Sequence, residues 1–182
     1  MEVRVLSRAQ IYFFIMLYTR KGDSGTTKTF GCDQRISKSS AVAEALGTLD
    51  EINSFLGICK VRSAEAGLAV ASGETFEQIV GWVQQNLFII QAELAGADKV
   101  IGEDKVKKLE SLTDGIEAEL PPITSFFVSG GTELGATFDV ARTIARRAER
   151  RVVESNEQNE KKLGAFTLPF LNRLSSLLYA LA

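Results

Sequence analysis

The chain has 182 residues, of which 45% are hydrophobic and 24% charged, and a net charge of −2. This composition is typical of a single globular domain with a sizeable core, and the charge balance argues against a nucleic-acid binder that works by bulk electrostatics. Histidine is absent. Its absence excludes Ser-His-Asp or Cys-His catalysis, histidine-ligated zinc and a di-iron bundle built on Glu-x-x-His.

The first 17 residues combine basic groups with a short apolar run, residues 11–17. The run is too short to span a membrane and no small-residue cleavage site follows it, so an extended or β-rich arm is expected. Met16 directly precedes a different kind of sequence and is a candidate for the natural start of translation, which would leave residues 1–15 non-native. The cysteines, Cys32 and Cys59, do not form a disulfide framework. Free cysteines indicate a reducing compartment, and we expect a cytoplasmic protein with no membrane partner.

Residues 19–29 are rich in glycine, hydroxyl and basic side chains. Glycines let backbone N–H groups approach an anion, and lysine and threonine add further donors. The stretch is almost a Walker P-loop starting at Gly22, but Thr27 stands where that motif needs glycine. No strand, crossover helix and second strand surround it, so a P-loop fold is rejected. A phosphate loop of another kind and a plain turn both remain open.

Helical periodicity predicts five helices between residues 39 and 182. The first starts at a cap on Ser39 or Ser40 and runs to about residue 61, and the second covers about 74–95. A third, 103–120, ends before two prolines, and a glycine-ended aromatic loop leads to the fourth, 132–154. The last covers about 161–181, where Pro169 either kinks the helix or marks its true start. The sum is an all-α, five-helix, single-domain bundle behind an N-terminal arm.

The fourth helix carries the densest charge in the chain. Phe138, Ala141, Ala145, Ala148 and Val152 follow spacings of three and four residues and form one narrow apolar seam. Arg142, Arg146 and Glu149 share a second face beside that seam, while Arg147 and Arg151 point elsewhere. Because Glu149 is the only acid inside this run of arginines, we expect another group to neutralise them. A solvated helix face and a polyphosphate site are the two interpretations.

Six blocks, taken in order, resemble the PduO-type ATP:corrinoid adenosyltransferases over roughly Leu17 to Ala182. They are Tyr18-Thr19-x-x-Gly22-Asp23-x-Gly25, Arg35-x-Ser37-Lys38, Gly47-Thr48-Leu49-Asp50-Glu51-Ile52-Asn53, Gly130-Gly131, Arg142-Thr143-x-x-Arg146-Arg147-Ala148-Glu149-Arg150 and Leu171-Asn172-Arg173-Leu174-Ser175. The resemblance implies a homotrimer of five-helix bundles with ferritin-like up-down packing, and sites for ATP and cob(I)alamin near the subunit interfaces. It also implies transfer of the 5′-deoxyadenosyl group to cobalt, with triphosphate as the leaving group.

Site residues implied by the resemblance fall into two sets. The ATP set comprises Thr19, Arg20, Lys21, Gly22, Thr27, Lys28, Lys38, Arg146, Arg147, Glu149, Arg150 and Asn172, with Mg²⁺ held mainly by the phosphates rather than by protein ligands. The catalytic set comprises Asp50 and Arg142, a pair that bridges neighbouring subunits, and Phe126, an aromatic that closes the lower face of the corrin.

This sequence departs from the family pattern at three positions: Ser129 replaces a usual proline, Ser176 a usual aspartate, and Pro169 interrupts the last helix. A corrinoid carrier without efficient turnover is the alternative interpretation. Either role is compatible with hand-off of adenosylcobalamin to a dependent enzyme.

Overall fold

The computed structural model describes residues 18–29, 34–121, 127–158 and 162–182. The predicted arm at 1–17 and the predicted corrin-facing Phe126 lie outside these ranges. The described residues form five helices and two short strands, which confirms the all-α bundle. They are α1 (Ala41–Ala66), α2 (Phe76–Leu94), α3 (Glu103–Glu117), α4 (Glu133–Gln158), α5 (Thr167–Ala180), β1 (Thr26–Thr27) and β2 (Ile36–Ser37).

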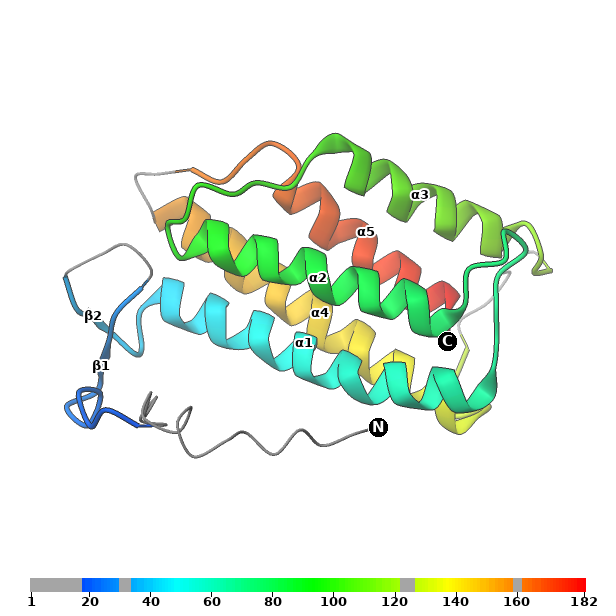
Figure 1. The fold of residues 1–182 in the computed structure, drawn as a ribbon, viewed down its shortest axis with the longest axis horizontal. Coiled ribbons are helices and arrows are strands. Elements are labelled where there is room, and N and C mark those ends of the chain that lie inside the picture. Colours follow the sequence, from blue (N-terminus) through cyan, green and yellow to red (C-terminus); the bar gives the residue numbers. More distant parts are fainter. Residues whose placement is uncertain (1–17, 30–33, 122–126, 159–161) are drawn as a thin grey trace, which may run out of the picture.

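Successive helices run up and down the long axis of the molecule (Figure 1). α1 packs against both α2 and α4, and α5 packs against both α4 and α3. The long helices α1 and α4 therefore form the centre of the bundle. In the described part of the chain, no helix combines the length and the apolar character needed to cross a membrane.

Local capping chemistry explains where the helices begin and end. The Ser40 side chain accepts a hydrogen bond from the backbone N–H of Ala43 at the start of α1, and Gly67 ends that helix with φ of 64°. α1 is therefore more than a turn longer than predicted. A capping box between Thr75 and Gln78 starts α2. α5 begins at Thr167 rather than near residue 161, and Pro169 sits in its first turn, where a missing N–H is tolerated.

The predicted seam of α4 is confirmed as its buried face. Phe138, Ala141, Ala145, Ala148 and Val152 are each at most 1% exposed. The small alanine side chains allow neighbouring helices to approach closely along this seam. Because the seam fixes the rotation of α4 about its own axis, it also fixes the direction in which the neighbouring arginine face points.

A buried carboxylate fixes the start of α5. Glu93, near the end of α2, is 7% exposed. It accepts hydrogen bonds of 2.6 Å from the backbone N–H of Gly164 and from the hydroxyl of Thr167. A buried carboxylate that accepts two donors at the positive end of a helix is well satisfied. This contact ties α2 to the first turn of α5, the helix that carries Asn172.

Candidate active site

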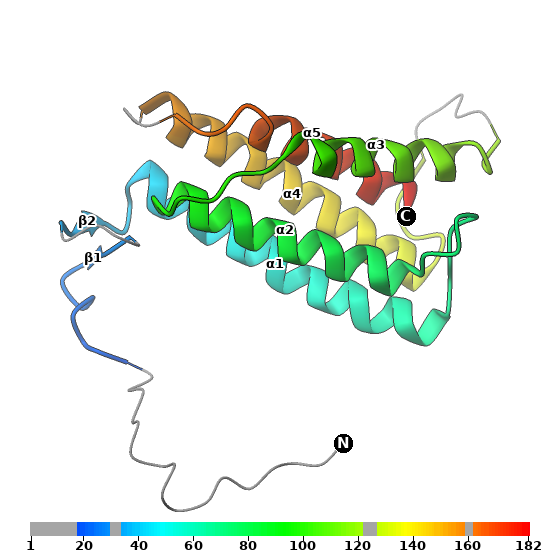
Figure 2. The same ribbon diagram turned by 45° about the horizontal axis from the view of Figure 1, so that its top comes forward.

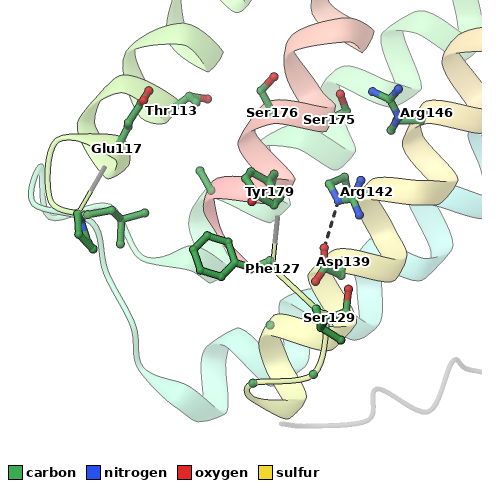
Figure 3. Close-up of a pocket in the computed structure, with 18 residues that line it drawn as sticks. Thr113, Glu117, Phe127, Ser129, Asp139, Arg142, Arg146, Ser175, Ser176 and Tyr179 are labelled. Carbon is green, nitrogen blue, oxygen red and sulfur yellow. Dashed lines mark hydrogen bonds and ion pairs between the residues drawn. The ribbon is translucent and has the colours of Figure 1, made fainter. Parts of the chain in front are cut away.

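A pocket of 690 Å³ opens where α3, α4 and α5 meet the loop after residue 126 (Figure 3). Its wall combines charged groups of α4, hydroxyl groups of α5 and exposed apolar side chains of the loop. The lining residues used below are Thr113, Glu117, Phe127, Val128, Ser129, Asp139, Arg142, Arg146, Ser175, Ser176 and Tyr179. A space of this size with both apolar and cationic walls suits a large ligand with an apolar body and polar edges.

Arg142 is held rigidly in the pocket wall. Its Nε donates to Asp139 Oδ1 at 3.1 Å, and its guanidinium lies 5.8 Å from the centroid of the Tyr179 ring (Figure 3). The side chains of Arg142 and Asp139 are 28% and 18% exposed. Partial burial, a charged partner and an aromatic face together restrict this guanidinium to one place. The spacing of three residues could have indicated Asp139 from the sequence, whereas nothing local indicated Tyr179.

The predicted pair of Asp50 with Arg142 is not formed within one chain. Asp50 is exposed and borders a different pocket between α1 and α2, beside Phe88 and Gln91. Arg142 takes Asp139 as its partner instead. The prediction concerned two neighbouring subunits, so it stays a prediction about an assembly.

Acidic groups outside the arginine run neutralise part of it, as the sequence predicted. Among the residues that the structure describes, three arginines of the run form ion pairs: Arg142 with Asp139, Arg147 with Glu51 at 2.5 Å, and Arg151 with Glu154 at 2.9 Å. Arg146 and Arg150 are exposed, and neither makes an ion pair with any residue that the structure describes. Because they are four residues apart on α4, their guanidinium groups project from the same side of the helix.

The Glu149 carboxylate accepts a hydrogen bond of 2.9 Å from the Asn172 side chain. This contact joins α4 to α5 beside the two unpaired arginines. The structure thus brings Arg146, Glu149, Arg150 and Asn172 into one area. Arg147 belongs to the same motif in the sequence, but its guanidinium is engaged on α1 by Glu51.

The loop between residues 18 and 38 is a small hairpin organised by Arg35. The Arg35 side chain donates to the hydroxyl and the carbonyl of Thr26, both at 2.7 Å, and to the carbonyl of Lys21 at 2.5 Å. Lys38 closes the hairpin with a backbone hydrogen bond of 2.9 Å to Gly25. The sequence places Arg35 in a motif but gives no sign of this structural role. Its partners, Thr26 and Lys21, come near it only when the hairpin folds.

Local backbone geometry shapes the hairpin around its basic groups. A Cβ on Gly22 would lie 3.1 Å from Nζ of Lys38, so the glycine leaves room for that lysine. Arg20 has φ of 57°, a left-handed backbone conformation that is uncommon outside glycine. The backbone N–H of Lys21 donates to the hydroxyl of Thr19 at 3.4 Å. The predicted loop residues Thr19, Arg20, Lys21, Gly22, Thr27, Lys28 and Lys38 all belong to this hairpin segment.

The helix residues and the loop residues form two separate groups in one chain. Figures 1 and 2 show the hairpin beyond the first turn of α1, away from α5 in both views. The contacts of the hairpin described above lie within residues 19–38, and those of the helix group join α4 to α5 or to α1. Among the described residues, no cluster of three or more cysteine, aspartate and glutamate side chains could hold a metal ion.

The fold and the pocket define a helical-bundle protein with an arginine-lined site suited to a large, partly anionic ligand. A comparison with protein families specifies this class further: residues 17–182 match the family described as cobalamin adenosyltransferase. The chain belongs to this family.

Relatives of similar sequence are also corrinoid adenosyltransferases. The chain is 38% identical to the corrinoid adenosyltransferase PduO of Salmonella typhimurium over an alignment of 174 residues, and the match covers 91% of this chain and 48% of that protein. It therefore spans about half the length of that relative. The corrinoid adenosyltransferase of Bacillus subtilis is 37% identical, with 91% of this chain and 84% of that protein covered.

A solved structure is also similar. It is a variant PduO-type ATP:corrinoid adenosyltransferase from Lactobacillus reuteri complexed with cobalamin and ATP, with a TM-score of 0.77 and 31% identity. The similarity covers 90% of this chain and 89% of that chain.

Proposed function

We propose that this chain transfers the 5′-deoxyadenosyl group of ATP to the cobalt of cob(I)alamin, giving adenosylcobalamin and triphosphate. Family membership and the similar complex with cobalamin and ATP support the reaction. The observation that carries the proposal is the position of α4. One face of this helix lines the 690 Å³ pocket with Arg142 and Arg146 and continues to the unpaired Arg150. A single rigid element therefore borders both a space for the corrin and a site for phosphates.

Arg146 and Arg150 are proposed to bind the triphosphate of ATP. Guanidinium groups stay charged at every physiological pH, and their fork matches phosphate oxygens. Glu149 and Asn172 complete this half of the site, and Arg147 joins it by exchanging Glu51 for a phosphate oxygen. The loop residues Thr19, Arg20, Lys21, Gly22, Thr27, Lys28 and Lys38 supply the other half. Cationic groups fixed before the reaction stabilise the charge that develops on the leaving triphosphate.

The donor set fits a magnesium ion that arrives with the nucleotide. The helix half of the site is mostly cationic, and its one carboxylate, Glu149, already accepts a hydrogen bond from Asn172. Mg²⁺ is therefore proposed to be held mainly by the phosphates, where it would neutralise part of the negative charge of the leaving group.

The pocket is proposed to hold the corrin. Cob(I)alamin is itself a strong nucleophile, so the reaction needs no nucleophilic side chain and no histidine. The protein has to hold the ribose C5′ in line with cobalt and to exclude water. Phe127 and Val128, which are 69% and 96% exposed, offer apolar surface at the pocket. We propose that the neighbouring Phe126 closes the lower face of the corrin.

A homotrimer with shared sites is proposed because one chain keeps the two ATP-binding groups apart. Apolar side chains on three helices support this assembly: Ile58, Val61, Phe88 and Val140 are between 46% and 61% exposed. Contact with neighbouring copies would bury them. Across such an interface, the exposed Asp50 of one copy would join Arg142 of the next. We further propose a cytoplasmic protein, supported by the free thiol of Cys59, and hand-off of the product to an adenosylcobalamin-dependent enzyme.

The test is an anaerobic assay with ATP, Mg²⁺ and chemically reduced cob(I)alamin. The expected result is loss of the Co(I) absorbance and formation of adenosylcobalamin and triphosphate in equal amounts. Binding of ATP and corrinoid without formation of these products would contradict the proposal and favour a carrier.

A further inference from the structure

The orientation of the Asn172 amide is set by two partners, one that accepts a hydrogen bond and one that donates a hydrogen bond. Its Nδ2 donates to Glu149 Oε1 at 2.9 Å, and its Oδ1 accepts from Nη1 of Arg173 at 2.9 Å. A carboxylate can only accept hydrogen bonds and a guanidinium can only donate them. Turning the amide over would oppose oxygen to oxygen and N–H to N–H. The chemistry of the two partners therefore permits one orientation.

Arg173 is itself held from a third helix. Its Nε donates to Glu110 Oε1 on α3 at 3.2 Å, and both side chains are 44% exposed. The planar fork of arginine lets Nε and Nη1 bond two different partners at fixed relative positions. A chain of contacts, Glu110 to Arg173 to Asn172 to Glu149, thus connects α3, α5 and α4.

The α3 end of this chain of contacts lies on a helix face that continues into the pocket wall. Thr113 and Glu117 follow Glu110 on α3 by three and seven residues, so the three lie on one helix face. Thr113 and Glu117 line the pocket, and Figure 3 shows both on the α3 side of it. The α3 wall of the pocket is therefore continuous with the anchor of Arg173.

We propose that Arg173 is a positioning residue that orients Asn172 for the nucleotide, and that Glu110 fixes Arg173. The inference rests on the proposed function, in which Asn172 binds ATP. With one N–H and one lone pair used inside the chain, Asn172 presents its remaining N–H and lone pair in a fixed direction. Without Arg173 only the contact with Glu149 restrains the amide, and ATP binding then has to supply the remaining order.

The test measures ATP binding by titration calorimetry with ATP and Mg²⁺ in the absence of corrinoid. It also measures KM for ATP and kcat in the anaerobic assay with cob(I)alamin. Arg173→Ala is expected to weaken ATP binding about tenfold, as loss of a charge-assisted hydrogen bond would. KM for ATP should rise by the same factor while kcat changes less than twofold. Asn172→Ala should have an equal or larger effect.

The double variant, Asn172→Ala with Arg173→Ala, separates positioning from direct binding. If Arg173 acts through Asn172, its loss changes ATP affinity less than twofold when Asn172 is already alanine. If the fold-losses in ATP affinity of the two single variants multiply in the double variant, the proposal is overturned. Glu110→Ala is expected to weaken ATP binding about threefold, because Arg173 keeps Asn172 but loses its anchor.

Arg151→Ala is the matched control. Arg151 pairs with Glu154 at 2.9 Å, and these side chains are 45% and 44% exposed, nearly the same as Arg173 and Glu110. Arg151→Ala should leave ATP binding unchanged, so an equal loss in both variants would indicate a general charge effect and overturn the inference.

Failure of the inference is distinguishable from failure of the proposed function. Wild-type protein that binds no ATP would refute both. Weakened binding in Asn172→Ala with normal binding in Arg173→Ala would refute the positioning role alone. Equal melting temperatures of the single variants will show that the compared proteins are folded.

Discussion

The two halves of the expected nucleotide site are held in different ways. On the bundle side, Arg146 and Glu149 project from a helix whose seam is buried along its length, and the partner helix α5 is fixed by Glu93. On the loop side, a two-residue strand pair and the Arg35 fork hold a hairpin whose side chains are largely exposed. The bundle half therefore has a rigid helical scaffold before ligands bind, while the loop half depends on its own few contacts. Substitutions in the two halves should therefore have different consequences.

The largest effect on activity is expected from Arg146→Ala on the bundle side. Removing one fixed donor to developing charge costs about 10²–10³ in kcat, and Arg146 is exposed, so the bundle should stay folded. Turnover and thermal melting measured on the same preparation check both parts. Arg151→Ala is the control, since Arg151 is an exposed arginine of the same helix with its own partner, Glu154. Unchanged kinetics in Arg146→Ala would remove this residue from the site.

Glu93→Ala tests how the bundle half is held. Its loss leaves the N–H of Gly164 and the hydroxyl of Thr167 without their acceptor, and we expect the free energy of unfolding to fall by about 3 kcal/mol. Urea unfolding measures the change as a lower midpoint at constant slope. Glu93→Gln keeps one acceptor oxygen and should lose less. A midpoint unchanged in Glu93→Ala would show that α5 is fixed by packing alone.

Arg35→Ala tests the loop half. Three hydrogen bonds are removed from the hairpin and none from the bundle. We expect KM for ATP to rise about tenfold because the loop must be ordered by the ligand, while the urea midpoint stays the same. A lower urea midpoint with an unchanged KM for ATP would show that Arg35 stabilises the bundle and does not order the loop for ATP.

The smallest effect concerns the Cys59 thiol in the bundle core. Burial raises its pKa from 9.0 to about 11. In a Cys32→Ser variant, a thiol reagent at pH 8 should react far more slowly with native than with urea-unfolded protein, because the thiolate is the reactive form. Between pH 9 and 11 the unfolded thiol loses its proton first, so the free energy of unfolding should fall as pH rises. Equal reaction rates in the native and unfolded states would contradict this.

Helix periodicity was sufficient to predict the fold, because the seam residues alone determine which side of α4 is buried. Boundaries depended on finer signals. Gly67 ends α1 by adopting a left-handed conformation, and Pro169 lies in the first turn of α5, where a missing N–H is tolerated. For Pro169, periodicity alone did not decide between a kink and the start of the helix.

The partners of the site residues were much harder to predict. Arg147 meets Glu51, and Arg173 meets Glu110, across helices that are far apart in the sequence. Such contacts depend on how helices rotate and slide against each other, which a one-dimensional pattern does not contain. Asp139 is the exception, since its spacing from Arg142 is local to one helix.

The central claim is that one complete ATP site needs the loop of one copy and the α4 and α5 residues of another. The most direct measurement mixes two inactive variants, Lys38→Ala in the loop and Arg146→Ala on α4, by unfolding and refolding them together. Turnover should reappear in the mixture, because some neighbouring copies then combine an intact loop with an intact α4. A control mixture of Arg146→Ala with Arg150→Ala, both from the helix half, should gain no turnover over its components. Turnover absent from the first mixture, with assembly intact, would contradict the shared site and place both halves within one chain.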